Sequence, residues 1–278
     1  MRSNSVESSL SKSNVIFVYT GNVGSSPMVQ ALSKCRHVFS PYHEQLDFRN
    51  LTEDTRPSDE AVRRAFKERI SILSSRPNNF RVSIAKWRPF VLKQAYGLQR
   101  EDLKSFSSVL ICRKYLLHQA VKITLNESVL GTRWPQFLKG DQAEEALALV
   151  KDFNRPLNRV ERKRALKIHR DLLKRTELTI SNSKLIFEER FGRKVITEDF
   201  LSPDLSHEKI EKLSKALFDR DDLVGDHFAE TSLVSSSKKI GFSMGQVTDL
   251  SDLWASKSVR DVEERYQEAI GSLETLRL

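Results

Sequence analysis

Short apolar runs rich in β-branched residues alternate along the chain with longer stretches in which apolar residues recur every three or four positions. A short continuous apolar run is typical of a buried strand, whereas the three-to-four spacing is typical of an amphipathic helix. The runs predict strands at residues 15–20, 80–87, 107–112 and 194–200.

The helical spacing predicts helices between and after these strands, and we expect the longest one, at 157–190, to be broken. The predicted helices cover residues 26–35, 58–73, 89–96, 114–125, 143–153, 157–190, 206–218 and 258–278. Strands that alternate with helices indicate an α/β fold in three layers, a mostly parallel sheet flanked by helices. Ligands of such folds bind beyond the carboxyl ends of the strands.

Composition also indicates the compartment of the protein, and the pattern of residues indicates how the chain divides into domains. No run approaches the roughly 20 apolar residues that span a bilayer, so we expect a soluble protein without a membrane span. Cys35 and Cys112 form no disulfide framework, which favours the reducing cytoplasm. We expect a disordered leader at 1–14, one α/β domain at 15–245 and a C-terminal helical extension at 246–278.

The net charge of +9 favours an anionic partner. Residues 155–175 hold nine Lys or Arg against two acids, while Leu157, Val160, Ile168 and Leu172 recur at roughly helical intervals. This pattern predicts a helix with one buried face and one cationic face. Because no aromatic platform or zinc-ligand pattern accompanies the charge, we do not expect nucleic acid as the partner.

The segment VIFVYTGNVGSSPMVQAL near the N-terminus predicts a strand, a tight loop and a helix. Gly21 and Gly24 allow a close turn, Ser25 and Ser26 supply hydroxyls and a helix cap, and Pro27 suits the first helical turn. A helix N-terminus after such a turn is suited to an anion. The loop is not a Walker A motif, because it lacks the Gly-Lys-Ser/Thr sequence.

Taken alone, this loop resembles that of low-molecular-weight tyrosine phosphatases and the related arsenate reductases. Tyr19 stands where that family has its nucleophilic Cys, and Ser25 stands where it has its Arg. Without a thiolate no covalent phosphoenzyme can form, and without the guanidinium the bidentate grip on phosphoryl oxygens is lost. A degenerate phosphatase-like domain is therefore one hypothesis.

A larger part of the chain, roughly residues 15–245, resembles sulfotransferases that use 3′-phosphoadenosine 5′-phosphosulfate (PAPS), in particular their bacterial carbohydrate-type branch. Five segments are similar to this family's motifs and follow one another in its order. They are TGNVGSS at 20–26, PYHEQLD at 41–47, VSIAKW at 82–87, VLICRKYLLHQAVK at 109–122 and VITEDF at 195–200. The resemblance implies a P-loop-like sulfotransferase architecture, with PAPS as the co-substrate and a hydroxyl, possibly of a carbohydrate, as the acceptor.

The resemblance also implies roles for individual residues. The loop that would bind the 5′-phosphosulfate comprises Thr20, Gly21, Asn22, Val23, Gly24, Ser25 and Ser26. Arg113 would bind the 3′-phosphate together with Lys122, which replaces the family's Ser. Glu44 would be the general base for the acceptor hydroxyl, aided or replaced by His43.

The family loop carries an Arg or Lys at the position of Asn22 or Val23, and this chain has no cation there. We expect the missing charge to come from Lys86, or else from Lys238 and Lys239. The histidines show no metal-ligand spacing, and PAPS chemistry needs no metal. A nucleotide- or anion-binding protein of the same fold, with lost or weak turnover, is the alternative function.

Overall fold

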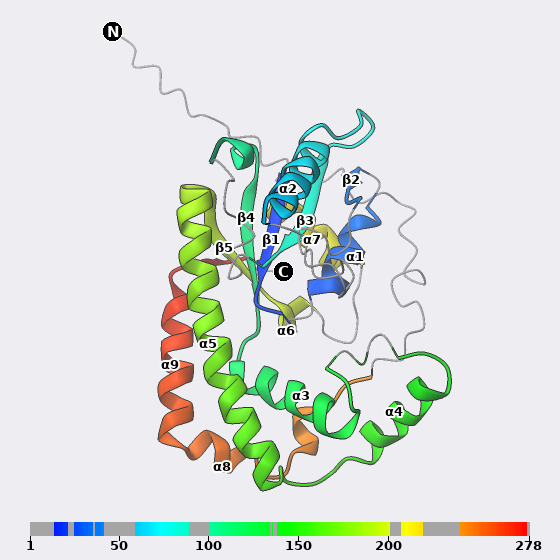
Figure 1. Ribbon diagram of the computed structural model, residues 1–278, viewed down its shortest axis with the longest axis vertical. Helices are drawn as coiled ribbons and strands as arrows, with labels where there is room; N and C mark the ends of the chain where they lie inside the picture. The colour runs from blue at the N-terminus through cyan, green and yellow to red at the C-terminus, as the bar shows by residue number, and fades with distance from the viewer. Residues whose placement is uncertain are drawn as a thin grey trace.

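The computed structural model describes residues 14–21, 25–35, 37–41, 59–88, 100–133, 135, 138–200, 207–218 and 240–276 (Figure 1). Its strands are β1 (Asn14–Tyr19), β2 (Val38–Phe39), β3 (Val82–Trp87), β4 (Ser107–Cys112), β5 (Phe191–Ile196) and β6 (Glu274–Thr275). Its α-helices are α1 (Ser25–Ser33), α2 (Asp59–Ser74), α3 (Leu116–Val129), α4 (Asp141–Asp152), α5 (Arg159–Phe187), α6 (Thr197–Phe200), α7 (His207–Phe218), α8 (Leu250–Ala255) and α9 (Lys257–Gly271).

The described strands form one six-stranded sheet in the order β2-β3-β1-β4-β5-β6, and every neighbouring pair is parallel. The central strand β1 pairs with β3 on one side and β4 on the other, with Val15 beside Ile84 and Tyr19 beside Ile111. The expected α/β class with a parallel sheet is confirmed.

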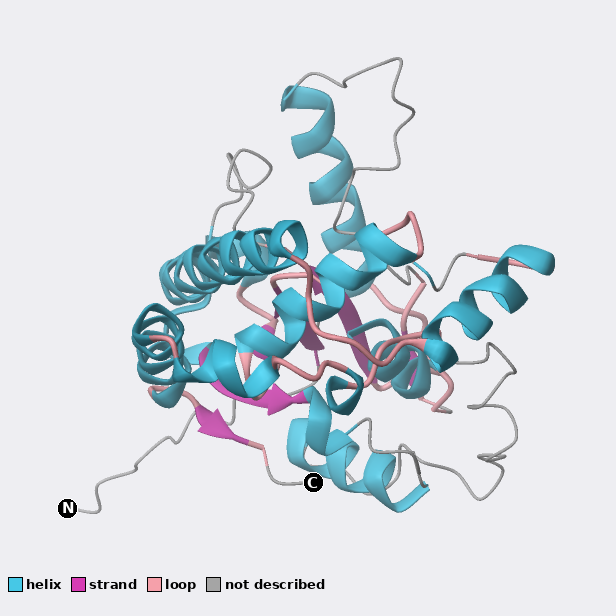
Figure 2. Ribbon diagram, turned by 90° about the horizontal axis from the view of Figure 1, so that it is seen from below, coloured by secondary structure: helices cyan, strands magenta, loops and turns pink. Residues whose placement is uncertain are grey.

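The side chains of β1 alternate between the two faces of the sheet. Ile16 and Val18 pack into one apolar core with residues of α2, α3, α5 and α9. Val15 and Phe17 pack into a second core with residues of α1 and α7. Because each face is covered by helices, residues 15–19 of β1 read as an unbroken apolar run in the sequence. Figure 2 shows the strands between these helices.

A third apolar cluster joins α3, α4, α8 and the first turns of α5, through residues such as Leu117, Val150, Ala165 and Leu253. These helices lie at the lower end of the molecule in Figure 1, past the point where β4 leads into α3. The structure therefore adds a small helical layer at the carboxyl end of the sheet.

Helix α5 runs unbroken for 29 residues, so the expected interruption is wrong. No Gly or Pro lies within the helix. Its buried stripe includes Ile168 and Leu172, as expected, but Val160 is 77% exposed, because Glu161 rather than Val160 begins the buried face. Despite the length of α5, no helix in the described part of the chain is long and apolar enough to cross a membrane.

A capping box and a buried ion pair hold Glu161 at the start of α5. The Glu161 carboxylate accepts hydrogen bonds from Arg155 at 2.7 and 2.8 Å and from the Asn158 backbone N–H at 2.8 Å, while the Asn158 side chain accepts from the Glu161 N–H. The Arg155 hydrogen bonds lower the pKa of Glu161 from 4.5 to about 2, and the Asn158 N–H and Ser128 add to the effect.

The Glu161 carboxylate should make stability depend on pH in a defined window, and its replacement should remove that dependence. Because folding lowers the pKa of Glu161, its stabilisation is complete above about pH 4.5 and is lost as the pH falls toward 2. We expect Glu161→Gln to lower the free energy of unfolding by about 1–3 kcal/mol at neutral pH. Urea unfolding at several pH values should show this difference shrinking below about pH 4.5. The exposed Glu145→Gln should show no such trend, and a pH-independent difference at position 161 would contradict the assignment.

Two further predicted elements need correction. The strand expected at 194–200 begins earlier, at Phe191, and ends at Ile196, because the buried Thr197 donates to the Cys112 carbonyl and starts α6. The helix expected at 258–278 ends at Gly271, and Glu274–Thr275 pairs with β5 as β6. The helix expected at 89–96 lies outside the described residues.

Candidate functional site

The candidate site lies where β1 and β4 end. From β1 the chain passes through α1 to β2 on one side of the sheet, whereas from β4 it passes through α3, α4 and α5 to β5 on the other side. Connections that diverge in this way leave a crevice at the carboxyl ends of the two strands, where open α/β sheets bind ligands. Thr20 and Gly21 follow β1 at this edge of the sheet, and Ser25 begins α1.

Gly21 makes the turn at the end of β1, and a side chain of α3 forms a hydrogen bond with it. Its φ of +95° is a conformation that side-chain-bearing residues rarely adopt, which explains the glycine. Gln119 on α3, which is 2% exposed, donates its side-chain N–H to the Gly21 carbonyl at 2.5 Å. The buried Gln119 Oε1 has no hydrogen-bond partner. The first turn of the loop is thereby fixed relative to the start of α3.

Two cationic side chains from the end of β3 approach this turn. The Lys86 Nζ lies 5.5 Å from the centre of the Tyr19 ring, and the Arg88 guanidinium carbon lies 5.2 Å from the same centre. A Cβ built on Gly21 would lie 3.9 Å from Arg88 Nη1. Lys86 is 1% exposed. Both cationic groups therefore lie beside the end of β1 and the glycine that follows it.

Arg113 follows β4 on the other side of the crevice. Its Nη1 donates to Glu198 Oε1 at 3.2 Å, and the Lys114 backbone N–H donates to Glu198 Oε2 at 3.0 Å. The buried Arg113 Nε makes no hydrogen bond. Glu198 thus orients the guanidinium from the start of α6.

Helix α9 fixes the segment that carries Arg113. Tyr266 donates its hydroxyl to the Arg113 carbonyl, and Gln267 donates to the Lys114 carbonyl at 2.8 Å. Burial raises the pKa of Tyr266 well above its usual value, so the hydroxyl keeps its proton as a donor. The carboxylate of Glu263 accepts the first backbone N–H groups of α3, from Leu116 at 3.3 Å and Leu117 at 2.6 Å.

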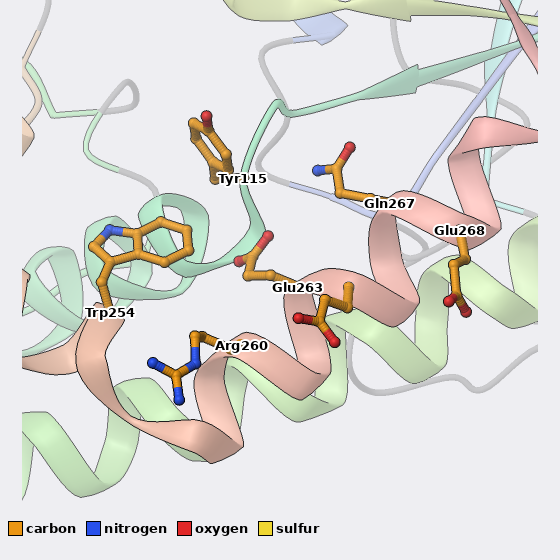
Figure 3. Close-up of a pocket in the computed structure, with 7 residues that line it drawn as sticks. Tyr115, Trp254, Arg260, Glu263, Gln267 and Glu268 are labelled. Atoms are coloured by element: carbon orange, nitrogen blue, oxygen red, sulfur yellow. The ribbon is translucent and has the colours of Figure 1, made fainter.

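A groove of about 350 Å³ lies beside this segment, between the start of α3 and helices α8 and α9. Figure 3 shows Tyr115 and Trp254 along one side of it and the polar side chains of α9 along the other. The Tyr115 and Trp254 rings meet edge to face at 5.3 Å, and both contact His118. Such a mixture of aromatic faces with carboxylate and amide groups suits a polar ligand that has an apolar face.

Lys122 lies on α3, one turn beyond His118, and Gln119 lies on the same helix. Lys122 therefore does not follow the end of a strand, as Arg113 does. Burial lowers the pKa of His118 and outweighs the opposite effect of the negative charges of Glu263 and Glu198, while the positive charges of Lys122 and Arg113 lower it further. The imidazole is therefore neutral at pH 7.

The described structure thus brings together Thr20, Gly21, Lys86 and Arg113 at the strand ends. Ser25 and Ser26 begin α1, as expected of a helix that follows the loop. The remaining predicted site residues lie outside the described residues: Asn22, Val23, Gly24, His43, Glu44, Lys238 and Lys239.

Several residues of the site were not predicted from the sequence. Arg88 carried a usable signal, because it is a second cation at the end of the strand that contains Lys86. No sequence signal identified Gln119, because a glutamine in an amphipathic helix is usually a surface residue. Only the packing of α3 in the structure shows that this one is buried. Glu198, within the segment VITEDF at 195–200, forms an ion pair with Arg113.

Among the described residues, neither the thiol of Cys35 nor any cluster of side chains is suited to thiol or metal chemistry. Burial raises the pKa of Cys35 to about 12, so its thiol stays protonated and is a poor nucleophile. Within the same residues, no group of three or more His, Cys, Asp or Glu side chains could hold a metal ion. The described charged groups at the strand ends include the side chains of Lys86, Arg88 and Arg113.

Comparison with known proteins adds no relative to this description: no protein-family model, curated protein or solved structure matches the chain.

Proposed function

We propose that the protein is a sulfotransferase that binds PAPS across the carboxyl ends of β1, β3 and β4 and moves its sulfuryl group to a hydroxyl acceptor, possibly of a carbohydrate. The observation that carries the proposal is the position of Lys86 and Arg88 beside Tyr19 and Gly21. The loop resembles the 5′-phosphosulfate loop of that family but contains no cation, and β3 supplies two cations next to it.

The strand order supports a ligand that spans the crevice. The β1–α1 loop and the β4–α3 segment flank the two strands whose connections diverge, so one ligand can contact both. PAPS carries anionic groups at both ends of its ribose. The loop, Lys86 and Arg88 suit the 5′-phosphosulfate, and the Arg113 guanidinium, which Glu198 orients, suits the 3′-phosphate.

In the proposed reaction, the acceptor oxygen forms a bond to sulfur while the bond from sulfur to the bridging phosphate oxygen breaks. The acceptor proton passes to Glu44 or His43, and the negative charge that leaves with the phosphate remains on adenosine 3′,5′-bisphosphate. Fixed cations at that oxygen lower the barrier, because they stabilise charge that develops only in the transition state. Lys86 and Arg88 are our candidates for this role.

Nucleotide binding provides the test. We expect calorimetry to show tighter binding of adenosine 3′,5′-bisphosphate than of adenosine 5′-monophosphate. Arg113→Ala should weaken the bisphosphate by on the order of tenfold to a hundredfold while leaving the monophosphate nearly unchanged, because only the bisphosphate carries the group that Arg113 contacts.

Arg190 offers a matched control, since its guanidinium donates to the carbonyls of Leu103 and Phe106, before β4 begins. Arg190→Ala should keep the preference for the 3′-phosphate. A parent protein without that preference would contradict the sulfotransferase proposal. A clear preference without transfer of labelled sulfate to any of a broad set of hydroxyl acceptors would instead favour a nucleotide-binding protein.

A further inference from the structure

Helix α5 presents a line of exposed residues on the side opposite its buried face. The members follow one another at intervals of three, four or seven positions, so they lie along one ridge of the helix. The α5 ridge consists of Val160, Lys163, Lys167, Arg170, Lys174, Leu178 and Leu185. It is about 38 Å long at 1.5 Å per residue.

The basic residues of the α5 ridge differ from three arginines near the start of this helix. Arg155, Arg162 and Arg164, which flank the ridge, pair with Glu161, Asp249 and Glu127. In the described part of the chain, the four cations of the ridge form no ion pair. The fold therefore neutralises these three arginines and leaves the ridge cationic.

The neighbouring helix α9 does not neutralise the ridge either. Its contact with the flank of α5 is an ion pair between Arg265 and Glu177 at 2.7 Å. Its acids Glu264 and Glu268 line the groove beside Tyr115, as Figure 3 shows for Glu268. Asp171 is the acid next to the ridge on α5 itself, and it is partly buried.

Large apolar side chains extend the ridge at both ends. Val160 is 77% exposed, Leu178 50% and Leu185 60%. Among the described residues, the other large apolar side chain with comparable exposure is Leu149 of α4, at 42%. Three of these four exposed side chains thus share one line with four cations. Exposed apolar groups that gather beside cations indicate an interaction surface rather than a merely solvated face.

We propose that the α5 ridge binds the surface of an anionic lipid bilayer. The four cations face lipid headgroups, and the aliphatic side chains enter the boundary between headgroups and acyl chains, as in helices that lie in the membrane plane. A nucleic-acid duplex would meet the charge but would leave Leu178 and Leu185 without an apolar partner, and the ridge has no aromatic ring on which a base could stack. This association is separate from the proposed reaction.

Vesicle co-sedimentation tests the charge. The full-length protein should bind vesicles of about one third phosphatidylserine in phosphatidylcholine, should bind them less well in high salt, and should bind pure phosphatidylcholine weakly. A quadruple variant with Lys163→Ala, Lys167→Ala, Arg170→Ala and Lys174→Ala should bind the anionic vesicles on the order of a hundredfold more weakly.

A matched control removes the same charge elsewhere. The exposed residues Arg63, Lys139, Lys151 and Lys257 form no ion pair in the described part of the chain, and their replacement by Ala also removes one Arg and three Lys. This control should keep at least most of the vesicle affinity. Equal losses in the two quadruple variants, or a parent protein that ignores anionic vesicles, would overturn the proposal.

The leucines distinguish a bilayer from a nucleic acid. Leu178→Ser with Leu185→Ser should weaken vesicle binding by about tenfold, because buried aliphatic area is lost. The same double variant should leave any binding to duplex DNA unchanged, and Leu149→Ser should leave both unchanged. If the parent binds duplex DNA more tightly than anionic vesicles and the leucine variant binds vesicles normally, the ridge is a nucleic-acid surface and the lipid proposal is wrong.

Discussion

Glu263→Gln is expected to lower the free energy of unfolding by about 3 kcal/mol, one of the largest effects of any single polar substitution in this protein. The Glu263 carboxylate is buried, and its oxygens accept the backbone N–H groups of Leu116 and Leu117 and lie 2.8 Å from His169 Nε2. An amide of the same shape has a single oxygen, so its NH₂ would face a backbone N–H that also donates. One donor at the start of α3 would then stay unsatisfied without access to water.

Thermal unfolding checks this expectation, and the neighbouring residue provides the control. A loss of about 3 kcal/mol corresponds to a fall in Tm of roughly 6–12 °C for a chain of this size. Glu264 follows Glu263 on α9 but is exposed, so Glu264→Gln should change stability by at most about 0.5 kcal/mol. Equal stabilities for the two variants would show that the carboxylate does not hold the start of α3.

The same substitution should also weaken the site. Tyr266 and Gln267, the next helical neighbours of Glu263, hold the carbonyls of Arg113 and Lys114. A displaced start of α3 would move Arg113 relative to the β1–α1 loop, since Gln119 ties α3 to Gly21. We therefore expect Glu263→Gln to reduce the preference for a 3′-phosphate, although Glu263 itself need not touch the nucleotide.

The parts of the fold that were predictable are those with a local signal. β4 was predicted with its observed limits, and β1 within one residue, because a strand buried on both faces is an unbroken apolar run. The two-residue strands β2 and β6 have no such run, and only their pairing with β3 and β5 defines them. The phase of α5 was wrong at Val160 because Glu161, a charged residue, occupies the buried face and is satisfied there by Arg155.

The residues of the candidate site were predictable only where a local sequence pattern marks them, as was the fold. Thr20, Lys86 and Arg113 were predictable because each stands at or near the carboxyl end of an apolar run, and parallel strands end at one edge of a sheet. The contacts that hold these residues come from distant parts of the chain. Gln119 reaches Gly21 across 98 positions, and Tyr266 reaches Arg113 across 153. No local pattern marks such pairs, because they depend on how α3 and α9 pack.

Replacing Lys86 by methionine is expected to lower kcat for the proposed sulfuryl transfer by about 10²–10³-fold, which is typical for the loss of one preorganised group that stabilises transition-state charge. Methionine keeps the length and packing of the buried stem but removes the ammonium, which lies beside Tyr19 at the start of the loop. The effect on KM for PAPS should be smaller, because the charge on the leaving oxygen grows as the bond to sulfur breaks.

Lys194 gives the matched control, since it is the other buried lysine of the described sheet. Its Nζ donates to the carbonyls of Ile270 and Leu273 at 2.6 and 2.8 Å, so its role is to join β5 to the end of α9. Lys194→Met should therefore lower Tm while kcat of the remaining folded protein stays near the parent value. Lys86→Met should show the reverse, a large loss of kcat with a smaller loss of Tm. If Lys86→Met keeps kcat while Lys194→Met loses it, the ammonium beside Tyr19 is structural, and the cation for transfer must come from Arg88 or from the pair Lys238 and Lys239.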